Sequence, residues 1–145
     1  MEKIKVIHVI TRFDKGGSSE NTFLTVQGLA KEKYEVILIR GLSEESRMGT
    51  EEAAAVERNL TEAEKSGVKV ITIPGLVRSI QPLNDLKTLL NLIRIFKNER
   101  PHIVHTHTSK AGILGRWAVF FAKVPIIVHT PHGHVFWGYF NKWKT

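Results

Sequence analysis

Short apolar runs alternate along this chain with longer segments in which apolar residues recur every three or four positions. The runs are short and rich in β-branched residues, which predicts buried strands, whereas the recurring pattern predicts amphipathic helices. The predicted strands cover residues 3–10, 34–39, 68–73, 103–105 and 126–129. The predicted helices run from Ser18 or Ser19 to about residue 31, and over residues 51–65, 82–99 and 111–121.

Two of these helices have apolar positions that predict a buried face, and serine or glycine marks two helix ends. Ser18 or Ser19 is expected to cap the first helix, and Gly67 to follow the end of the second. The predicted inward residues are Phe23, Leu24, Val26 and Leu29 in the first helix, and Leu83, Leu86, Leu90, Ile93 and Phe96 in the helix over 82–99.

Regular alternation of strands and helices predicts an α/β fold, a Rossmann-like parallel sheet with helices on both faces. We expect the strand order 3-2-1-4-5. The topological switch then lies between the first and fourth strands, and ligands of such sheets bind beyond the carboxyl ends of the strands there. The segments expected at this edge are Gly16-Gly17 and residues 105–110, while residues 41–50 are expected to form a mobile loop.

Composition adds limits to this picture. With 145 residues, 42% of them apolar and 24% charged, the chain matches one globular domain of ordinary size. It has no cysteine, which excludes disulfides and thiolate chemistry and favours a reducing cytoplasm. We expect no signal peptide, because the first apolar run is short and contains His8, and no membrane span.

Charge is distributed unevenly. The chain has 21 basic and 14 acidic residues, yet residues 101–145 contain no Asp or Glu. The basic residues there are Lys110, Arg116, Lys123, Lys142 and Lys144. Such a surface attracts phosphates on nucleotides or lipid head groups, although it also fits a merely solubilising face. No motif supports nucleic-acid binding, so we expect none.

Gly16 and Gly17 follow the first predicted strand and precede a helix. Paired glycines there allow a diphosphate to approach free backbone amides at the helix start, although an ordinary tight turn would use the same residues. The dinucleotide pattern G-x-G-x-x-G is absent, and no acid ends the second strand, which disfavours a nicotinamide dehydrogenase.

Five of the seven histidines lie on or just after the last two predicted strands: His105, His107, His129, His132 and His134. Two His-x-His pairs suggest a metal site, but this region has no carboxylate to complete one, so we expect no metal and no cofactor. Each histidine alone fits a structural role in a loop. No Ser-His-Asp triad or carboxylate pair occurs, so any catalysis would rest on positioning and charge stabilisation.

Three blocks within residues 4–136 carry a specific resemblance: VIHVITRFDKGGSSENT, PHIVHTHTSKAGILGRWA and PIIVHTPHGHVF. Their order and spacing resemble the amino-terminal half of a GT-B glycosyltransferase of the family 4 type. The first block has Gly-Gly-Ser-Ser-Glu where the family more often has Gly-Gly-Ala-Glu. The resemblance implies a retaining, metal-independent enzyme with two domains and a nucleotide-sugar donor in the cleft between them.

The resemblance also implies roles for individual residues. Gly16 and Gly17 would lie against the donor diphosphate, and His132 would be the catalytic histidine that reaches the transferred sugar. The acceptor side of the cleft would comprise His105, His107, Ser109, Lys110, Gly133 and His134. Acceptors of the family are commonly carried on membrane lipids, which suits a cytoplasmic protein at the inner face of the membrane.

The family's carboxyl-terminal donor-binding domain has no counterpart in residues 1–145, so we expect a truncated chain or a partner subunit. The aromatic residues at the end, Phe136, Trp137, Tyr139, Phe140 and Trp143, agree with a surface that something else covers. Two alternatives stay open: a non-catalytic module that binds sugar phosphates or nucleotides, and a fragment of a GT-B sugar-nucleotide epimerase.

Overall fold

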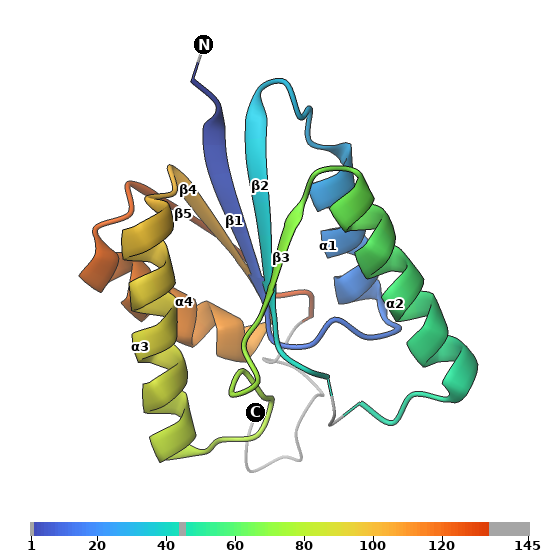
Figure 1. Cartoon of the computed structure of the whole chain (residues 1–145). Coiled ribbons are helices and arrows are strands. Elements are labelled where there is room, and N and C mark those ends of the chain that lie inside the picture. The colour runs from blue at the N-terminus through green and yellow to red at the C-terminus, as the bar shows by residue number, and fades with distance from the viewer. Residues whose placement is uncertain (1, 44–45, 134–145) are drawn as a thin grey trace.

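A five-stranded parallel sheet forms the centre of the molecule, whose computed structural model describes residues 2–43 and 46–133. The strand order is β3-β2-β1-β4-β5, which confirms the predicted topology (Figure 1). The strands are β1 (Ile4–Ile10), β2 (Tyr34–Arg40), β3 (Lys69–Thr72), β4 (Ile103–His107) and β5 (Ile126–Thr130). β1 therefore lies in the middle, with β2 on one side and β4 on the other.

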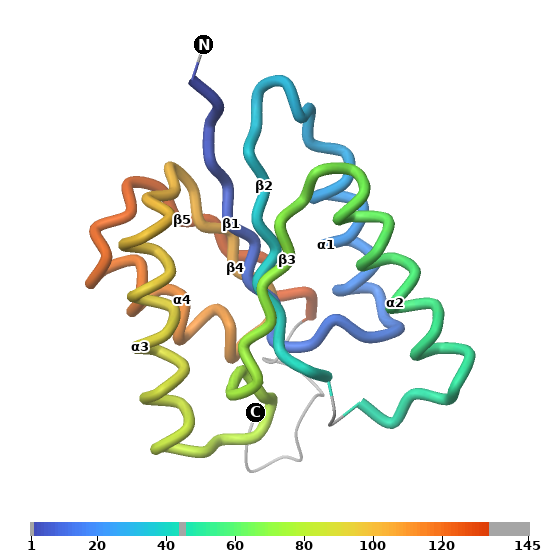
Figure 2. The backbone as a smooth tube through the Cα atoms, in the orientation of Figure 1, coloured from blue at the N-terminus to red at the C-terminus, as the bar shows by residue number. Residues whose placement is uncertain are grey.

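Helices cover both faces of the sheet in pairs, as Figures 1 and 2 show. They are α1 (Gly17–Gly28), α2 (Thr50–Lys65), α3 (Pro82–Glu99) and α4 (Ser109–Ala122). One apolar cluster joins α1 and α2 to one face through Phe23, Val26, Val56 and Leu60. A second joins α3 and α4 to the other face through Leu92, Phe96, Leu114 and Ala118. No helix in the described part of the chain is long and apolar enough to cross a bilayer.

The end of α2 follows the prediction, but the start of α1 does not. Gly67 has φ +90°, the left-handed conformation that a glycine after a helix adopts at little cost. The expectation that Ser18 or Ser19 caps α1 is wrong, because the helix begins at Gly17 with Gly16 at the cap position. Ser19 is buried instead and bonds the preceding loop.

The inward face of α3 also differs from the prediction. Phe96 is buried as expected, but Leu83, Leu86 and Leu90 are exposed, Leu83 to 80%. The side-chain amide of Asn84 donates a hydrogen bond of 2.7 Å to the carbonyl of Gly75 in the β3–α3 loop. Thr88 and Leu92 point inward instead, and the contact of Asn84 with Gly75 agrees with this rotation of the helix. Leu24 in α1 is exposed in the same way, because Phe23 and Val26 occupy the inward positions.

β4 is longer than predicted and runs to His107, because it keeps its pairing with β1 as far as Ile10.

The backbones of three segments approach one another closely at Gly41, just after β2. A Cβ there would lie 2.0 Å from the carbonyl oxygen of Leu76 and 2.4 Å from that of Thr11. Only a glycine permits this approach.

Candidate functional site

A cavity of about 520 Å³ opens at the carboxyl edge of the sheet, at the switch point between β1 and β4 where the strand order reverses. Its walls come from the β1–α1 loop, the β3–α3 loop, the start of α4 and the turn after β5. They include Arg12, Arg78, Ser109, Lys110, His132 and Gly133. The cavity lies where ligands bind in open parallel sheets, as the sequence predicted.

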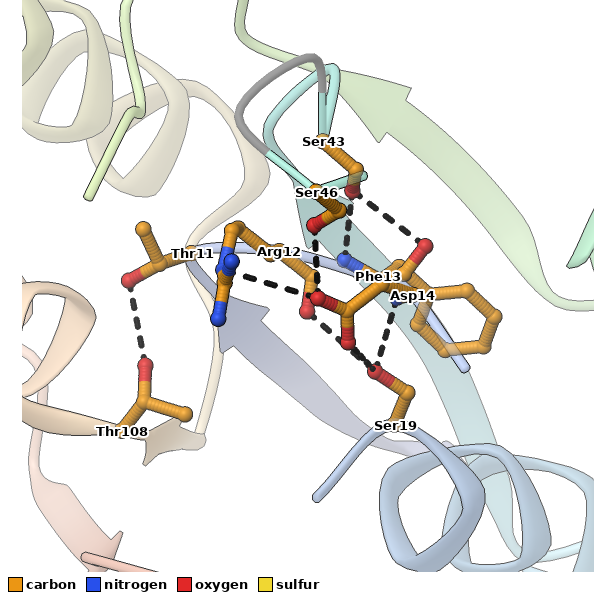
Figure 3. Close-up of polar contacts among 8 residues, drawn as sticks. All are labelled: Thr11, Arg12, Phe13, Asp14, Ser19, Ser43, Ser46 and Thr108. Atoms are coloured by element: carbon orange, nitrogen blue, oxygen red, sulfur yellow. Dashed lines mark hydrogen bonds and ion pairs between the residues drawn. The ribbon is translucent and has the colours of Figure 1, made fainter. Parts of the chain in front are cut away.

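The β1–α1 loop is held rigid by Asp14, which Figure 3 shows at the centre of a polar network. Its carboxylate accepts hydrogen bonds from the hydroxyls of Ser46 (2.6 Å) and Ser19 (3.2 Å) and lies 3.5 Å from Nε of Arg12. The hydroxyl of Ser43 accepts a hydrogen bond from the backbone N–H of Phe13 at 2.9 Å. The segment expected to be a mobile loop thus supplies two of the serines that fix this wall.

The two glycines that follow have no structural need to be glycines. Gly16 has an extended φ of −173°, which any residue adopts. A Cβ on Gly16 would come no closer than 3.7 Å to the Asp14 side chain, and a Cβ on Gly17 would meet nothing within 4 Å. Neither the turn nor the packing therefore explains this pair. A molecule outside the described chain that approaches the backbone would explain it.

The opposite wall begins at Thr108, between β4 and α4. This residue has φ 67°, a costly conformation for a β-branched residue that usually marks a functional turn. Its hydroxyl lies 3.1 Å from that of Thr11, and the Thr11 hydroxyl also accepts a hydrogen bond from the backbone N–H of Ala111. A side chain from the end of β1 thus caps the first turn of α4.

Lys110 is less available than the sequence indicated. Its ammonium pairs with Asp85 of α3 at 2.5 Å and donates to the carbonyl of Ser79, and its side chain is only 12% exposed. Residues 101–145 contain no acidic residue, but α3 contributes the carboxylate of Asp85 to this part of the structure. Of the other basic residues named above, Arg116 is exposed on α4 and Lys123 is exposed directly after its end.

Three imidazoles form a chain that leads from the interior to the cavity wall. Nδ1 of His8 lies 3.1 Å from Nε2 of His107, and Nδ1 of His107 lies 2.8 Å from Nε2 of His132. His8 and His107 are buried, while His132 is half-buried in the turn after β5 and lines the cavity. His132 has φ 58°, so it too adopts a left-handed conformation uncommon outside glycine.

Burial keeps these rings neutral. It lowers the pKa of His8 to about 3 and that of His107 to about 2, and the charges of neighbouring histidines act in the same direction. Burial and the charge of His129 also lower the pKa of His132. At neutral pH each ring therefore has one N–H donor and one acceptor nitrogen, which a chain of hydrogen bonds requires.

His105 lies beside this chain, His129 lies on the other face of the sheet, and both form hydrogen bonds with threonines. Nε2 of His105 lies 2.8 Å from the hydroxyl of Thr130, and Nδ1 of His129 lies 3.0 Å from that of Thr106. Both rings have a lowered pKa, with burial the largest cause. His129 packs against Gly112 of α4, so it is on the opposite face of the sheet from the chain of three.

Nitrogen atoms of His8, His105 and His107 lie within 4.8 Å of one another, the one group of three potential metal ligands among the described residues. Nδ1 of His8 contacts Nε2 of His107, Nε2 of His105 contacts the hydroxyl of Thr130, and no carboxylate of the described residues joins them. The geometry favours a hydrogen-bonded cluster over a metal centre. Absence of bound metal stays a prediction.

The structure therefore brings together part of the predicted site. Ser109, Lys110, His132 and Gly133 line the cavity, and Gly16 and Gly17 follow directly on its Asp14 wall. His107 lies behind His132 and His105 beside it, away from the cavity lining. His134 is outside the described residues. The analysis of the sequence missed His8, which carried no signal beyond a polar residue in an apolar run.

Comparison with known proteins identifies relatives of this chain. The model of Glycosyltransferase Family 4 matches residues 15–145. A UDP-Gal:alpha-D-GlcNAc-diphosphoundecaprenol alpha-1,3-galactosyltransferase of Escherichia coli is 46% identical over 77 residues, which are 53% of this chain and 20% of that protein. The capsular polysaccharide biosynthesis glycosyltransferase CapM of Staphylococcus aureus is 32% identical over 96 residues, 66% of this chain and 25% of that protein.

Solved structures share the fold at low sequence identity. A glycosyltransferase from Rickettsia africae superposes with a TM-score of 0.65 at 19% identity, over 92% of this chain and 31% of that one. A putative UDP-N-acetylglucosamine 2-epimerase from Listeria monocytogenes gives 0.63 at 18% identity, over 90% and 31%. The chain spans about a fifth to a quarter of the length of its curated relatives.

Proposed function

The chain belongs to Glycosyltransferase Family 4, and from that membership we propose that it is the acceptor-side half of a retaining glycosyltransferase with a GT-B architecture. The proposed reaction moves a sugar from a nucleotide-sugar donor to a glycan carried on a lipid. The bond between the anomeric carbon and the donor diphosphate breaks. The acceptor hydroxyl forms its bond to that carbon on the same face of the sugar, and its proton passes to the departing phosphate.

The observation that carries this proposal is the cavity at the switch point, with His132 on its wall and the glycine pair beside it. Gly16 and Gly17 leave open space at the start of α1, where backbone amides and the helix dipole favour a diphosphate. In the proposed complex His132 donates a hydrogen bond to the transferred sugar or its phosphate. Both interactions stabilise negative charge on the leaving group without a metal ion.

The acceptor would occupy the part of the cavity lined by Ser109, Lys110 and Gly133. Lys110 is already paired with Asp85, so in this proposal it donates a hydrogen bond rather than contributing a net positive charge. His105 and His107 support this wall from behind. Most donor contacts belong to a second domain outside these 145 residues, either on a longer chain or on a partner subunit.

The curated relatives support this choice of substrates, since the name of the Escherichia coli enzyme specifies UDP-galactose and a lipid diphosphate acceptor. In this proposal the protein meets its lipid-linked acceptor in the cytoplasm, at the inner face of the membrane. An exposed aromatic cluster on α4, formed by Trp117, Phe120 and Phe121, lies on the same helix as Arg116. Sedimentation with anionic vesicles should therefore decrease steeply with salt, whereas equal binding to neutral vesicles would contradict the electrostatic part.

The test uses UDP-galactose and GlcNAc-diphosphoundecaprenol with two proteins: this chain alone, and a chimera in which it replaces the corresponding segment of the Escherichia coli relative. We expect transfer by the chimera, with the anomeric configuration of the donor retained in the product by NMR, and none by the chain alone. Turnover of about 1 per second or more by the chain alone would contradict the half-enzyme proposal. A folded, inactive chimera that still binds UDP would favour the non-catalytic binding module.

A further inference from the structure

The chain of imidazoles has a direction that the structure itself determines. In a run of neutral rings each N–H must point to an acceptor nitrogen, so the tautomer of one ring sets the tautomer of the next. The two ring contacts, His8 to His107 and His107 to His132, leave only two consistent arrangements. They differ in which nitrogen of His132 carries the proton.

The inner end of the chain separates these arrangements. Nε2 of His8 is buried and has no hydrogen-bond partner within the described parts of the chain. If protons pointed inward, His8 would place an N–H donor at this unpartnered position. If they point outward, His8 donates through Nδ1 and leaves only a lone pair there. Buried N–H groups without an acceptor are rarer in proteins than acceptors without a donor, so the outward direction is favoured.

We propose that His8 and His107 are positioning residues that fix His132 as an Nδ1–H donor aimed at the cavity. His8 donates from Nδ1 to Nε2 of His107, which donates from its own Nδ1 to Nε2 of His132. Because Nε2 of His132 is thus occupied as an acceptor, Nδ1 is the nitrogen left for a ligand.

The arrangement selects the ligand by chemistry. An Nδ1–H donor on the wall of a cavity binds oxygen acceptors, namely phosphate oxygens or a sugar hydroxyl, and rejects groups that only donate. In this respect the inference deepens the proposed function and rests on it. The tautomers themselves are a property of the chain and do not depend on any transfer reaction.

Two-bond ¹H–¹⁵N correlation spectra of the ¹⁵N-histidine-labelled chain at pH 7.5 test the inference, because they distinguish Nδ1–H from Nε2–H rings. We expect the Nδ1–H form for His8, His107 and His132 alike, although the Nε2–H form prevails for histidine in water. An Nε2–H signal for His132 in the unmodified chain would overturn the inference. So would stoichiometric zinc in protein purified without an affinity tag, because metal would occupy these nitrogens.

Two variants of His107 sharpen the test. His107→Phe keeps a ring of similar shape without a donor, so His132 should change to a predominantly Nε2–H form. His107→Asn places an amide N–H near the position of Nδ1 and should preserve the Nδ1–H form of His132. An unchanged tautomer in both variants would show that His107 does not set it. Normal tautomers together with an inactive chimera would instead contradict only the proposed function.

Discussion

β1 has neighbours of opposite character on its two sides. Along β2 its residues pair with apolar partners, Ile7 with Ile37 and Val9 with Ile39. Along β4 the same strand pairs His8 with His105, Val9 with Thr106 and Ile10 with His107. Toward the carboxyl end the β2 side stays apolar as far as Ile39, before Arg40, whereas the β4 side has His105, Thr106 and His107 in succession.

The difference separates stability from function within one sheet. The β2 side gains from apolar burial and needs no particular partner geometry. The β4 side contains buried histidine rings, and each of these rings requires hydrogen-bond partners. Such a polar network stabilises the fold only when its hydrogen bonds are formed. That side ends at the cavity, whereas the β2 side ends at the close contact of Gly41 with Leu76 and Thr11.

Acid should affect the β4 side first, and this is the largest effect we expect. The folded-state pKa values of His8 and His107 lie near 3 and 2, far below the ordinary value of 6.5, so protons bind the unfolded chain preferentially. Their contribution to stability is complete above pH 6.5 and is lost as pH falls, by about 1.4 kcal/mol per pH unit for each ring. Urea unfolding should show a loss on the order of 4 kcal/mol between pH 6.5 and 5.

The partly exposed histidines act with the same sign and a smaller share, since their pKa values are lowered too. The carboxyl of Glu99 has its pKa lowered by hydrogen bonding to Lys69, so its contribution is lost only at more acidic pH, outside this window. His8→Leu is the matched variant and should reduce the slope by about 1.4 kcal/mol per pH unit. A flat stability profile in the unmodified chain would show that these rings are not buried neutral.

Truncating a buried side chain on the β2 side should lower the free energy of unfolding by nearly as much, and this loss should not depend on pH. Leu38 is fully buried opposite His8, so Leu38→Ala removes packed atoms and leaves a cavity, at about 3 kcal/mol of unfolding free energy. Leu24→Ala is the control in α1, where the side chain is exposed and the change should stay within about 0.5 kcal/mol. Equal losses for both variants at pH 7 would contradict the burial described here.

The sequence predicted the topology because alternating strands and helices leave few ways to build a parallel sheet. It did not predict the rotation of α3, because the regular spacing of the leucines does not show which side packs on the sheet, where Leu92 and Phe96 lie in the core. The length of β4 was underestimated for a related reason. The predicted strand stopped at residue 105, and it is the pairing of Thr106 and His107 with β1 that extends it.

As with the fold, only part of the candidate site could be predicted from the sequence. The glycine pair and the His132 turn follow elements whose ends meet at the switch point, so their neighbourhood could be inferred. The contacts of Asp14 with Ser46 and of Phe13 with Ser43 could not, because these hydrogen bonds span about 30 residues. The partnership of His8 with His107 spans 99 residues and has no spacing signal.

Loss of the His132 donor should reduce catalysis by an amount comparable with one transition-state hydrogen bond. In the chimera described above, His132→Ala should lower turnover on the order of 10²-fold, about 2.7 kcal/mol, with the melting temperature almost unchanged. Leu90→Ala, at an exposed position of α3, is the control. Reduced stability with normal activity per folded molecule would mean that His132 belongs to the structural side of the comparison.

The smallest expected effect concerns Thr11, which joins the end of β1 to the β4 side. Its hydroxyl lies between the hydroxyl of Thr108 and the backbone N–H of Ala111, in a helix start that has no cap of its own. Thr11→Val keeps the shape but leaves that N–H without an acceptor, which should cost about 1 kcal/mol in urea unfolding.

Thr25→Val is the matched control, because that hydroxyl bonds only to the carbonyl of Asn21 within its own helix. The two variants remove the same atom, so a difference between them measures the link across the sheet rather than the loss of a hydroxyl. If Thr11→Val leaves stability and the amide exchange of Ala111 unchanged, the link does not hold α4 in place. The strained backbone of Thr108 must then be maintained by its backbone bond to Thr130.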